Sequence, residues 1–336
     1  MIDMTRMDRV PKGYVEFTDT TTTTVATLIP EQWAKRVELT AQPLQHFRLM
    51  TGPEEGMMPI VEKTDLDGEP GSKVNVNKLG NLSTSSPSYI IAETDDLEGS
   101  EQALSLSEVE ITPAEWGTRV RYTKSADEDV TDSLRTKAML ALGNWVAQVE
   151  DLAAYTAAAA GSSVIWGGDA TSVGDMDVTD VLSLTTLNKA KAKLAADNAP
   201  IVMPNGVYVC IMNTFQSYDL FSSSAWQTAV RDGQVRGDTN PLFTGSLGIW
   251  NGIALYETNN VTRTQSATSA ANYYSSAIMF GARAMAKVTK RNWMWKEYEK
   301  PDGRRFAIYV SARKAYKIIN STHLVELTTS AVDPNA

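Results

Sequence analysis

The chain has 336 residues, 43% of them hydrophobic, with a net charge of −9 and one cysteine. This apolar content is enough for a sizeable core and excludes disorder throughout the chain. A single cysteine excludes an internal disulfide, no apolar run approaches the roughly 20 residues of a membrane span, and the acidic balance argues against nonspecific binding to nucleic acid or anionic lipid as the main task.

The first thirty residues show little periodicity and are expected to form an arm. Residues 1–14 are charged and lack a hydrophobic region, so they do not resemble a signal peptide, and we expect folding in a reducing cytoplasm. Pro30 and Glu31 predict the first turn of a helix that Pro43 ends. A short amphipathic segment at 44–50 then meets the turn at Gly52-Pro53.

Residues 55–62 are expected to form a short strand, followed by turns at Asp67-Gly68 and Pro70-Gly71. Between Lys73 and Thr123, several segments alternate apolar and polar side chains at period two, which predicts strands with one buried face. Residues 103–112 and 117–123 are expected to pair as a hairpin through Pro113, Ala114 and Glu115. The polar run 83–88 predicts an exposed loop. These segments together suggest an extended arm rather than part of a compact core.

A long helix is predicted from about Thr131 to Ala160, roughly 45 Å long at 1.5 Å per residue. Ser125 and Glu128 have capping-box spacing, and the acids around them favour the positive end of a helix. Gly143 predicts a bend or close packing within the helix. Residues expected to share its buried face recur every three or four positions: Leu134, Ala138, Leu142, Trp145, Val149 and Leu152.

The rest of the chain predicts a mixture of helices and strands. Helices are expected from Thr179 or Leu184 to Ala196, at 214–220 and at 225–231, and an irregular loop at 232–248. Strands are expected at 201–203 and 207–212 around Asn205-Gly206, at 247–256 with a break at Asn251-Gly252, and at 275–280, 285–289, 294–299, 305–315 and 318–327. Asp302-Gly303 supplies a turn between the strands at 294–299 and 305–315.

Catalytic and metal-binding motifs are missing from the sequence. His46 and His323 stand in unrelated contexts, and one cysteine with two histidines at these spacings makes no zinc site. Cys210 lies in an apolar strand and is expected to be a core residue. Trp293 and Trp295 beside basic residues resemble a nucleic-acid surface, although a strand with one face in the core explains them equally well. We expect no enzyme, no cofactor and no metal.

Charge is distributed unevenly along the chain. Residues 93–132 contain twelve acids against three bases, and residues 283–317 contain eleven bases against three acids. Two solvated faces of opposite sign are the ordinary explanation. The alternative is that the two segments meet, within a subunit or between neighbours.

The order of these elements resembles the Hong Kong 97-like fold of tailed-phage major capsid proteins, and the chain is similar to the coat-protein family typified by phage N-four. The resemblance spans nearly the whole chain, but each motif is short; Trp116 stands where we expect Tyr or Phe. The matching stretches are Ile29-Pro30-Glu31-Gln32-Trp33, Lys78 to Leu82, Leu97 to Leu104, Trp116-Gly117, Phe280-Gly281-Ala282-Arg283 and Asp302-Gly303-Arg304-Arg305.

The resemblance implies an α+β fold with an N-terminal arm, a β-hairpin E-loop, a spine helix, and peripheral and axial domains. The corresponding divisions are 1–52 for the arm and short helix, 53–124 for the E-loop, 125–178 for the peripheral domain with its spine helix at 131–160, 179–272 for the axial domain, and 273–336 for the returning peripheral strands and C-terminus.

The resemblance also implies a coat protein that assembles into hexamers and pentamers of an icosahedral virion shell around double-stranded DNA. The expected partners are further copies of the chain, a separate scaffolding protein, a portal, a decoration protein and packaged DNA in weak contact, with assembly in the host cytoplasm. From the short N-terminus we expect no long fused scaffolding segment. The alternatives are an encapsulin-type compartment shell and a hydrolase with paired carboxylates.

The uneven charge predicts where neighbouring subunits meet. An acidic E-loop that docks over the basic strands of the adjacent subunit would set register more than affinity. The predicted interface residues are Asp95, Asp96, Glu98, Glu101, Arg283, Lys287, Arg304 and Arg305.

Overall fold

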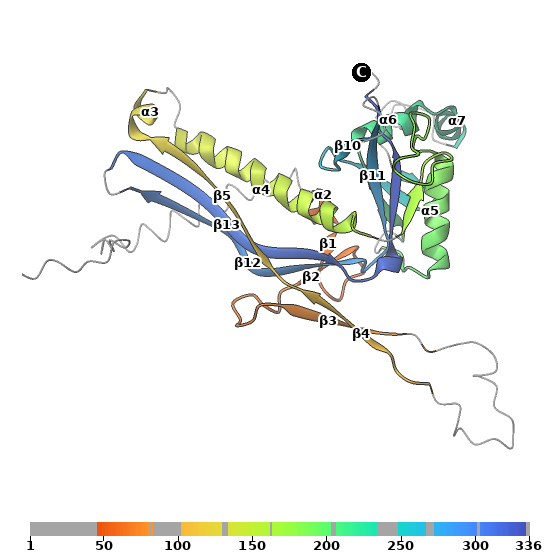
Figure 1. Ribbon diagram of the computed structural model, residues 1–336, viewed down its shortest axis with the longest axis horizontal. Coiled ribbons are helices and arrows are strands. Elements are labelled where there is room, and N and C mark those ends of the chain that lie inside the picture. The colour runs from red at the N-terminus through yellow and green to blue at the C-terminus, as the bar shows by residue number, and fades with distance from the viewer. Residues whose placement is uncertain are drawn as a thin grey trace, which may run out of the picture.

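The computed structural model describes residues 46–80, 82, 102–129, 134–161, 163–202, 206–233, 248–266, 272–300 and 303–333. These residues form two β-sheets, one long helix and a projecting hairpin (Figure 1). The helix predicted from Pro30 and the polar run 83–88 lie outside the described residues. No helix among the described residues is long and apolar enough to cross a membrane.

The first sheet, here called the long sheet, has the strand order β1-β2-β12-β13-β5. Its two longest strands, β12 (Met285–Glu299) and β13 (Arg305–Ile318), run antiparallel on either side of the turn at Gly303. The two separate strands predicted at 285–289 and 294–299 are one strand, with register shifts between them. The shorter members are β1 (Thr51–Gly52), β2 (Ile60–Lys63) and β5 (Ala114–Thr123).

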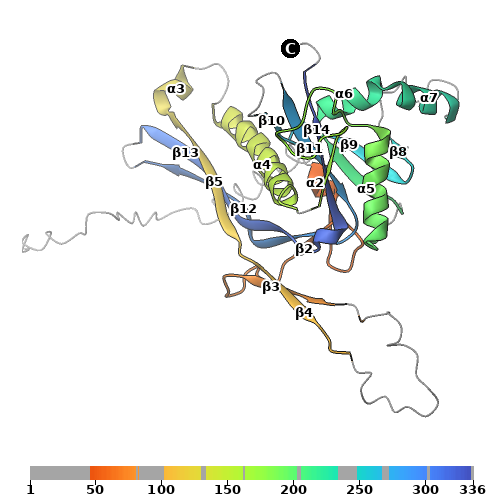
Figure 2. The same cartoon turned by 45° about the vertical axis from the view of Figure 1, so that its right-hand side comes forward.

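The predicted hairpin between 103–112 and 117–123 is wrong. β4 (Leu106–Ile111) pairs with β3 (Val74–Leu79), whereas β5 pairs along its whole length with β13. Pro113 has no backbone N–H to continue a ladder and lies where the chain passes from one pairing to the other. The β3–β4 hairpin therefore projects from the base of the long sheet, as both views show (Figures 1 and 2).

The long helix, α4 (Leu134–Ala158), lies along one face of the long sheet and spans about 37 Å. The predicted capping box at Ser125 is wrong, because residues 124–128 form a separate helix, α3 (Lys124–Glu128). The side chain of Thr123 caps α3 by accepting a hydrogen bond from the N–H of Ala126 at 3.3 Å.

The buried face of α4 is rotated from the predicted one. Ala138 and Leu142 are buried as expected and pack against Ile308 and Val310 of β13. Leu152, by contrast, is 43% exposed, and the buried face continues through Val146, Ala147, Glu150, Asp151, Ala154, Tyr155 and Ala158. The sequence pattern failed here because two carboxylates, Glu150 and Asp151, occupy buried positions.

The second sheet has the order β6-β14-β11-β7-β9-β8, with β10 paired to β11. Its strands are β6 (Val164–Trp166), β7 (Tyr208–Met212), β8 (Ile249–Trp250), β9 (Ile253–Glu257), β10 (Arg263–Gln265), β11 (Tyr273–Phe280) and β14 (Leu324–Ser330), which follows the 3-10 turn η2 (Ser321–His323). β8 and β9 meet at Asn251-Gly252, where both residues have positive φ, as the predicted break requires.

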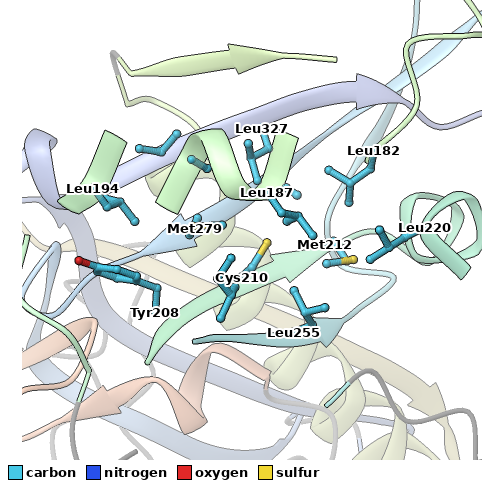
Figure 3. Close-up of a cluster of buried hydrophobic side chains, with 14 of the residues drawn as sticks. Leu182, Leu187, Leu194, Tyr208, Cys210, Met212, Leu220, Leu255, Met279 and Leu327 are labelled. Carbon is cyan, nitrogen blue, oxygen red and sulfur yellow. The ribbon is translucent and has the colours of Figure 1, made fainter. Parts of the chain in front are cut away.

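Three helices belong to this second unit: α5 (Leu184–Ala196), α6 (Thr214–Ser222) and α7 (Ser224–Gly233), close to the predicted ranges. Leu187 and Leu194 of α5 pack on Cys210, Met279 and Leu327 of the sheet (Figure 3). Cys210 is fully buried, which confirms its predicted place in the core, and burial raises the pKa of its thiol to about 12. The other sheet face packs against α2 (His46–Leu49) and the end of α4.

The C-terminal segment contributes to both sheets. β11 and β14 pair with each other in the second sheet, whereas β12 and β13, which lie between them in the chain, belong to the long sheet. The predicted division at 272/273 thus falls before a strand that pairs with β7 of the preceding segment. Two chain crossings, after Phe280 and after Ile318, join the sheets.

Candidate interaction surfaces

α4 covers one face of the long sheet. On the other face the base of the β3–β4 hairpin packs on Ala286 and Val288 at one end, and no described element covers the outward residues of β5 and β12 toward Gly303. On the covered face, Val120 and Tyr122 of β5 and Trp293 and Trp295 of β12 pack beneath α4. Side chains alternate along a strand, so the residues between them point away from α4. The cross-strand partners on that side are Arg121, Ala307 and Tyr298 in one row and Arg119, Tyr309 and Lys296 in the next.

This uncovered side carries a group of positive charges, here called the basic face: Arg119, Arg121, Lys296 and Arg305, all exposed. Among the described residues, none of these four cations has a carboxylate within ion-pair distance. Glu115 lies on the same side of β5, but it is paired with Arg291 at 2.6 Å. The basic face therefore has a positive potential that no described carboxylate offsets by direct pairing.

Aromatic and apolar side chains lie among these charges. The rings of Tyr298 and Tyr309 are 6.2 Å apart in an edge arrangement, and Tyr298 is 38% exposed. Met294, the next outward residue on β12, is 41% exposed. Exposed tyrosine, methionine and arginine are the residue types enriched at protein interfaces.

Beneath α4, on the covered face, lies a buried ionic cluster. Glu150 of α4 forms an ion pair with Lys314 of β13 and accepts a hydrogen bond from the Trp293 indole at 2.8 Å. Lys287 of β12 is paired with Glu62 of β2 at 3.1 Å. Burial alone would raise the pKa of Glu150, but the ammonium groups of Lys314 and Lys287 outweigh it and hold that pKa below its usual range.

The next residue of α4 makes a second polar anchor. Asp151 accepts the backbone N–H groups of His46 and Phe47 at 3.0 and 3.1 Å and the amide of Asn260 at 3.1 Å. Burial raises the pKa of Asp151 despite these donors. The two adjacent carboxylates thus fix α4 to the long sheet on one side and to α2 and the loop after β9 on the other.

Both ends of the β3–β4 hairpin are apolar, but only the base packs against the rest of the subunit. At its base, Val74 and Ile111 are buried against Ala286 and Val288 of the long sheet. At the far end Leu79 and Leu106 are cross-strand partners and are 65% and 74% exposed. Leu82 and Leu104, just beyond, are also exposed. Exposed leucines grouped on one projecting element mark a contact surface.

A shallow apolar pocket of about 510 Å³ lies between the second half of α4 and the long sheet. Val149, Leu152 and Thr156 of α4 line one side, and Trp116 and Tyr316 line the other. Leu152, which the sequence pattern placed in the core of the subunit, is thus a wall of a surface pocket.

Two of the predicted interface residues are used inside the subunit. Lys287 is only 9% exposed and pairs with Glu62 within the subunit, and its role at an interface stays a prediction. Arg283 is exposed, but its guanidinium donates to the carbonyls of Glu54 and Gly56 at 2.9 and 3.4 Å. Both lie at the end of the long sheet nearest the hairpin.

Arg304 and Arg305 are exposed at the opposite end of β12 and β13. The structure therefore separates the four predicted basic residues into two groups and does not bring them together. The predicted acidic residues Asp95, Asp96, Glu98 and Glu101 lie outside the described residues. Their role at an interface stays a prediction.

Sequence reasoning missed Arg119 and Arg121, which it counted within an acidic segment. The signal that could have found them was present: if Val120 and Tyr122 face the core, period-two alternation turns Arg119 and Arg121 outward. Their pairing with Tyr309 and Ala307 depends on a contact about 190 positions away along the chain. No local pattern contains that contact.

The two histidines belong to different elements, α2 and the 3-10 turn η2. His46 begins α2, and the Nδ1 atom of His323 lies 2.9 Å from the carbonyl of Ala282. Among the described residues no group of three His, Cys, Asp or Glu side chains could hold a metal ion.

Comparison with known proteins supports a particular fold. The family model described as phage capsid protein matches residues 153–293. The capsid of Ralstonia phage GP4 is 21% identical with a TM-score of 0.69, covering 87% of this chain and 92% of that chain. The capsid of cyanophage Pam1 is 15% identical with a TM-score of 0.67, covering 85% and 92%. No curated protein sequence matches the chain.

A virus-like particle from Pyrococcus furiosus is also similar, at 12% identity and a TM-score of 0.52, covering 89% of this chain and 99% of that chain. At these identities the likenesses establish the fold. The chain has the Hong Kong 97-like capsid fold, which confirms the fold predicted from the sequence resemblance.

Proposed function

We propose that this chain is the major capsid protein of a tailed bacteriophage and that its copies assemble into the hexamers and pentamers of an icosahedral shell. The main support for this function is the structural match to the capsid of Ralstonia phage GP4, which covers 87% of this chain. The phage capsid family model, which matches residues 153–293, supports the same function independently of the coordinates.

The surfaces of the subunit support assembly on physical grounds. A hairpin with exposed leucines at its far end, an uncovered sheet face and an apolar pocket beside α4 are costly to leave in water. A shell of many copies would cover such surfaces, whereas an isolated monomer would leave them exposed.

The proposed contact between neighbours joins the acidic segment, with Asp95, Asp96 and Glu98, to basic strands of the adjacent subunit. Reversal of these three acids to lysine should impair shell assembly by turning attraction into repulsion. Normal particles from that variant, counted by electron microscopy, would refute the contact.

Negative-stain microscopy of the purified protein tests the function itself. Closed shells or capsomer rings are expected if the subunits associate through interfaces of the size typical of stable complexes. A protein that stays monomeric by analytical ultracentrifugation across concentrations and salt conditions would contradict the proposal.

A compartment shell that is not viral is the second candidate, because the virus-like particle from Pyrococcus furiosus shares the fold. The higher TM-score to the Ralstonia phage capsid and the family match favour the phage shell. Nuclease-protected DNA of uniform length inside purified particles supports the phage shell, and an enclosed protein cargo without DNA supports the compartment.

The proposal also specifies where the protein assembles and which partners it has. The protein would assemble in the host cytoplasm and reside in the virion, with a separate scaffolding protein, a portal, a decoration protein and packaged double-stranded DNA in weak contact. No catalysis and no cofactor belong to this function.

A further inference from the structure

The turn between β8 and β9 holds a chemically labile pair of residues. Asn251 is exposed, and Gly252 follows it. Because glycine has no Cβ, its backbone nitrogen can approach the side-chain carbonyl of a preceding asparagine without steric hindrance. An exposed Asn-Gly pair is therefore a place where a chain can modify itself without an enzyme.

The modification is deamidation, which takes two steps. The backbone nitrogen of Gly252 attacks the side-chain carbonyl carbon of Asn251, forming a C–N bond. The bond to the amide nitrogen breaks, and ammonia leaves with the proton from Gly252, so that a five-membered cyclic imide remains. Water then opens the imide at either carbonyl, giving aspartate or isoaspartate. The net change consumes one water and releases one ammonia.

Two side chains of α5, here called the α5 clamp, hold the amide of Asn251. Its Nδ2 donates to Oδ1 of Asn188 at 3.0 Å. The Nζ atom of Lys191 donates to Oδ1 of Asn251 at 3.2 Å and also to its backbone carbonyl. Asn188 and Lys191 are three positions apart and therefore lie on one face of the helix. Both polar atoms of the amide are engaged.

The backbone of the turn is held in place as well. Asn251 and Gly252 have φ values of 45° and 74°, the two positive values of a type I′ turn. The carbonyl of Gly252 accepts the N–H of Tyr208 at 3.0 Å, which ties the turn to β7. The N–H of Gly252 itself makes no hydrogen bond to a described residue. The restraint on the reaction therefore acts on the amide that is attacked and not on the attacking nitrogen.

We propose that Asn251 is a deamidation site and that the α5 clamp slows the reaction while the subunit is folded. Cyclisation needs the side-chain carbonyl carbon to reach the nitrogen of Gly252, and the rate follows the population of that conformer. The hydrogen bonds to Asn188 and Lys191 must break before the side chain can turn. A cation near Oδ1 could stabilise the oxyanion of the attack, but only after that turn has been made.

The two products would affect the subunit differently. Aspartate keeps the backbone unchanged and places a carboxylate beside the ammonium of Lys191. Isoaspartate adds one atom to the backbone, so a two-residue turn no longer keeps Trp250 opposite Ile253. Because β8 has only two residues, this product would unpair it. Every contact involved lies within one subunit, so the proposal does not depend on assembly.

Removal of the clamp in the full-length protein tests the proposal. Samples are incubated at neutral pH, and peptide mapping by mass spectrometry measures amide, aspartate and isoaspartate at Asn251 over time. Asn188→Ala with Lys191→Met should raise the rate of deamidation about tenfold or more, because one neutral and one charge-assisted hydrogen bond are lost. Lys191→Arg keeps a charged donor and should stay within about twofold of the unchanged protein.

Two controls separate the clamp from a general loosening of the fold. Lys189→Met removes an exposed lysine of α5 two positions from Lys191 and should leave the rate within about twofold. The other Asn-Gly pair of the sequence, Asn205-Gly206, is an internal standard in every sample. Its rate should be the same in all variants, because the substitutions remove contacts of Asn251. Thermal unfolding of each variant establishes that the subunit is folded.

The unfolded chain supplies the second measurement. In concentrated urea, Asn251 of the unchanged protein should deamidate at least about tenfold faster than in the folded subunit, because turn and clamp are both lost. Equal rates in the folded and unfolded chain would overturn the proposal. So would an unchanged rate without the clamp, an equal rise at both Asn-Gly pairs, or a slower reaction in Lys191→Met, which would show that the ammonium promotes the attack.

Discussion

Glu150 is one of two buried carboxylates that fix the position of α4. Its carboxylate is 6% exposed, and it holds Lys314, which is 3% exposed, and the indole of Trp293. Removal of one member of a buried ion pair leaves the other charge unpaired, which costs more than the pair itself contributes. Buried pairs of this kind specify orientation more than they add stability.

Glu150→Gln should therefore destabilise the subunit by about 3–5 kcal/mol, because Lys314 stays buried without a counter-charge. Glu150→Met with Lys314→Met should recover most of that loss, because both charges are gone and the space stays filled. Urea unfolding of unassembled subunits measures both variants. A double variant as unstable as Glu150→Gln alone would contradict the explanation.

Asp219 of α6 offers a pH test at the same scale. Burial raises the pKa of its carboxyl from 3.8 to about 6. A group whose pKa is raised in the folded state stabilises the protein below its unfolded pKa and loses that contribution as pH rises through the folded pKa. The charged form of Asp219 is thus unfavourable to folding at neutral pH.

Asp219→Asn should consequently raise the free energy of unfolding at pH 7.5 by about 1.5 kcal/mol, a value already discounted for partial solvent screening. The difference from the unchanged protein should shrink as pH falls from 7 through 6 toward 4. Denaturant midpoints across this range check it. A difference that is constant with pH would indicate that Asp219 does not titrate in this way.

At the scale of elements, the two ends of the β3–β4 hairpin have different roles: the base contributes to the stability of the subunit, and the far end is available for assembly. Its base contributes buried apolar contacts, and its far end contributes exposed ones. Leu79→Gln with Leu106→Gln should change the free energy of unfolding by no more than about 0.5 kcal/mol, because both side chains are exposed in the subunit. The same variant should assemble poorly if these leucines contact a neighbour, as sedimentation velocity would reveal.

Ile111→Ala, at the base of the same hairpin, should lower the stability of the subunit. Ile111 is 1% exposed, so its truncation should cost about 2–5 kcal/mol of subunit stability. An equal loss of stability from the two leucine changes would mean that the far end is packed within the subunit, contrary to its exposure.

Elements defined by local pattern could be predicted from the sequence, and their partners could not. The periodicity of 184–196 and the turn at Asn251-Gly252 were sufficient to place α5 and the β8–β9 turn, because both depend on neighbouring residues. The hairpin expected at Pro113 failed, because β5 pairs with a strand about 190 residues later. Pairing at that distance depends on the tertiary core.

The interaction surfaces were predicted in part, for the same reason. The excess of bases at 283–317 indicated a basic region, but strand alternation divides those bases between a buried cluster with Lys287 and Lys314 and the outward basic face. Arg119 and Arg121 join that face only after β5 pairs with β13. Composition predicted the sign of the charge, and sheet register decided which residues carry it.

At the scale of the whole molecule, the net charge of −9 bears on the contents of the proposed shell. A strongly basic inner surface would grip phosphates tightly and resist both filling and release of the genome. A subunit with this acidic balance offers little positive surface for DNA overall. Weak contact with the packaged molecule is the expected consequence.

Isolated capsomers should accordingly bind duplex DNA only weakly at physiological salt, with a dissociation constant no tighter than the roughly 10⁻⁴–10⁻⁶ M of nonspecific binding. Fluorescence anisotropy with a labelled duplex over a salt series measures this affinity. Tight, steeply salt-dependent binding by capsomers would show that they expose an extensive positive surface, contrary to the weak contact with DNA proposed here.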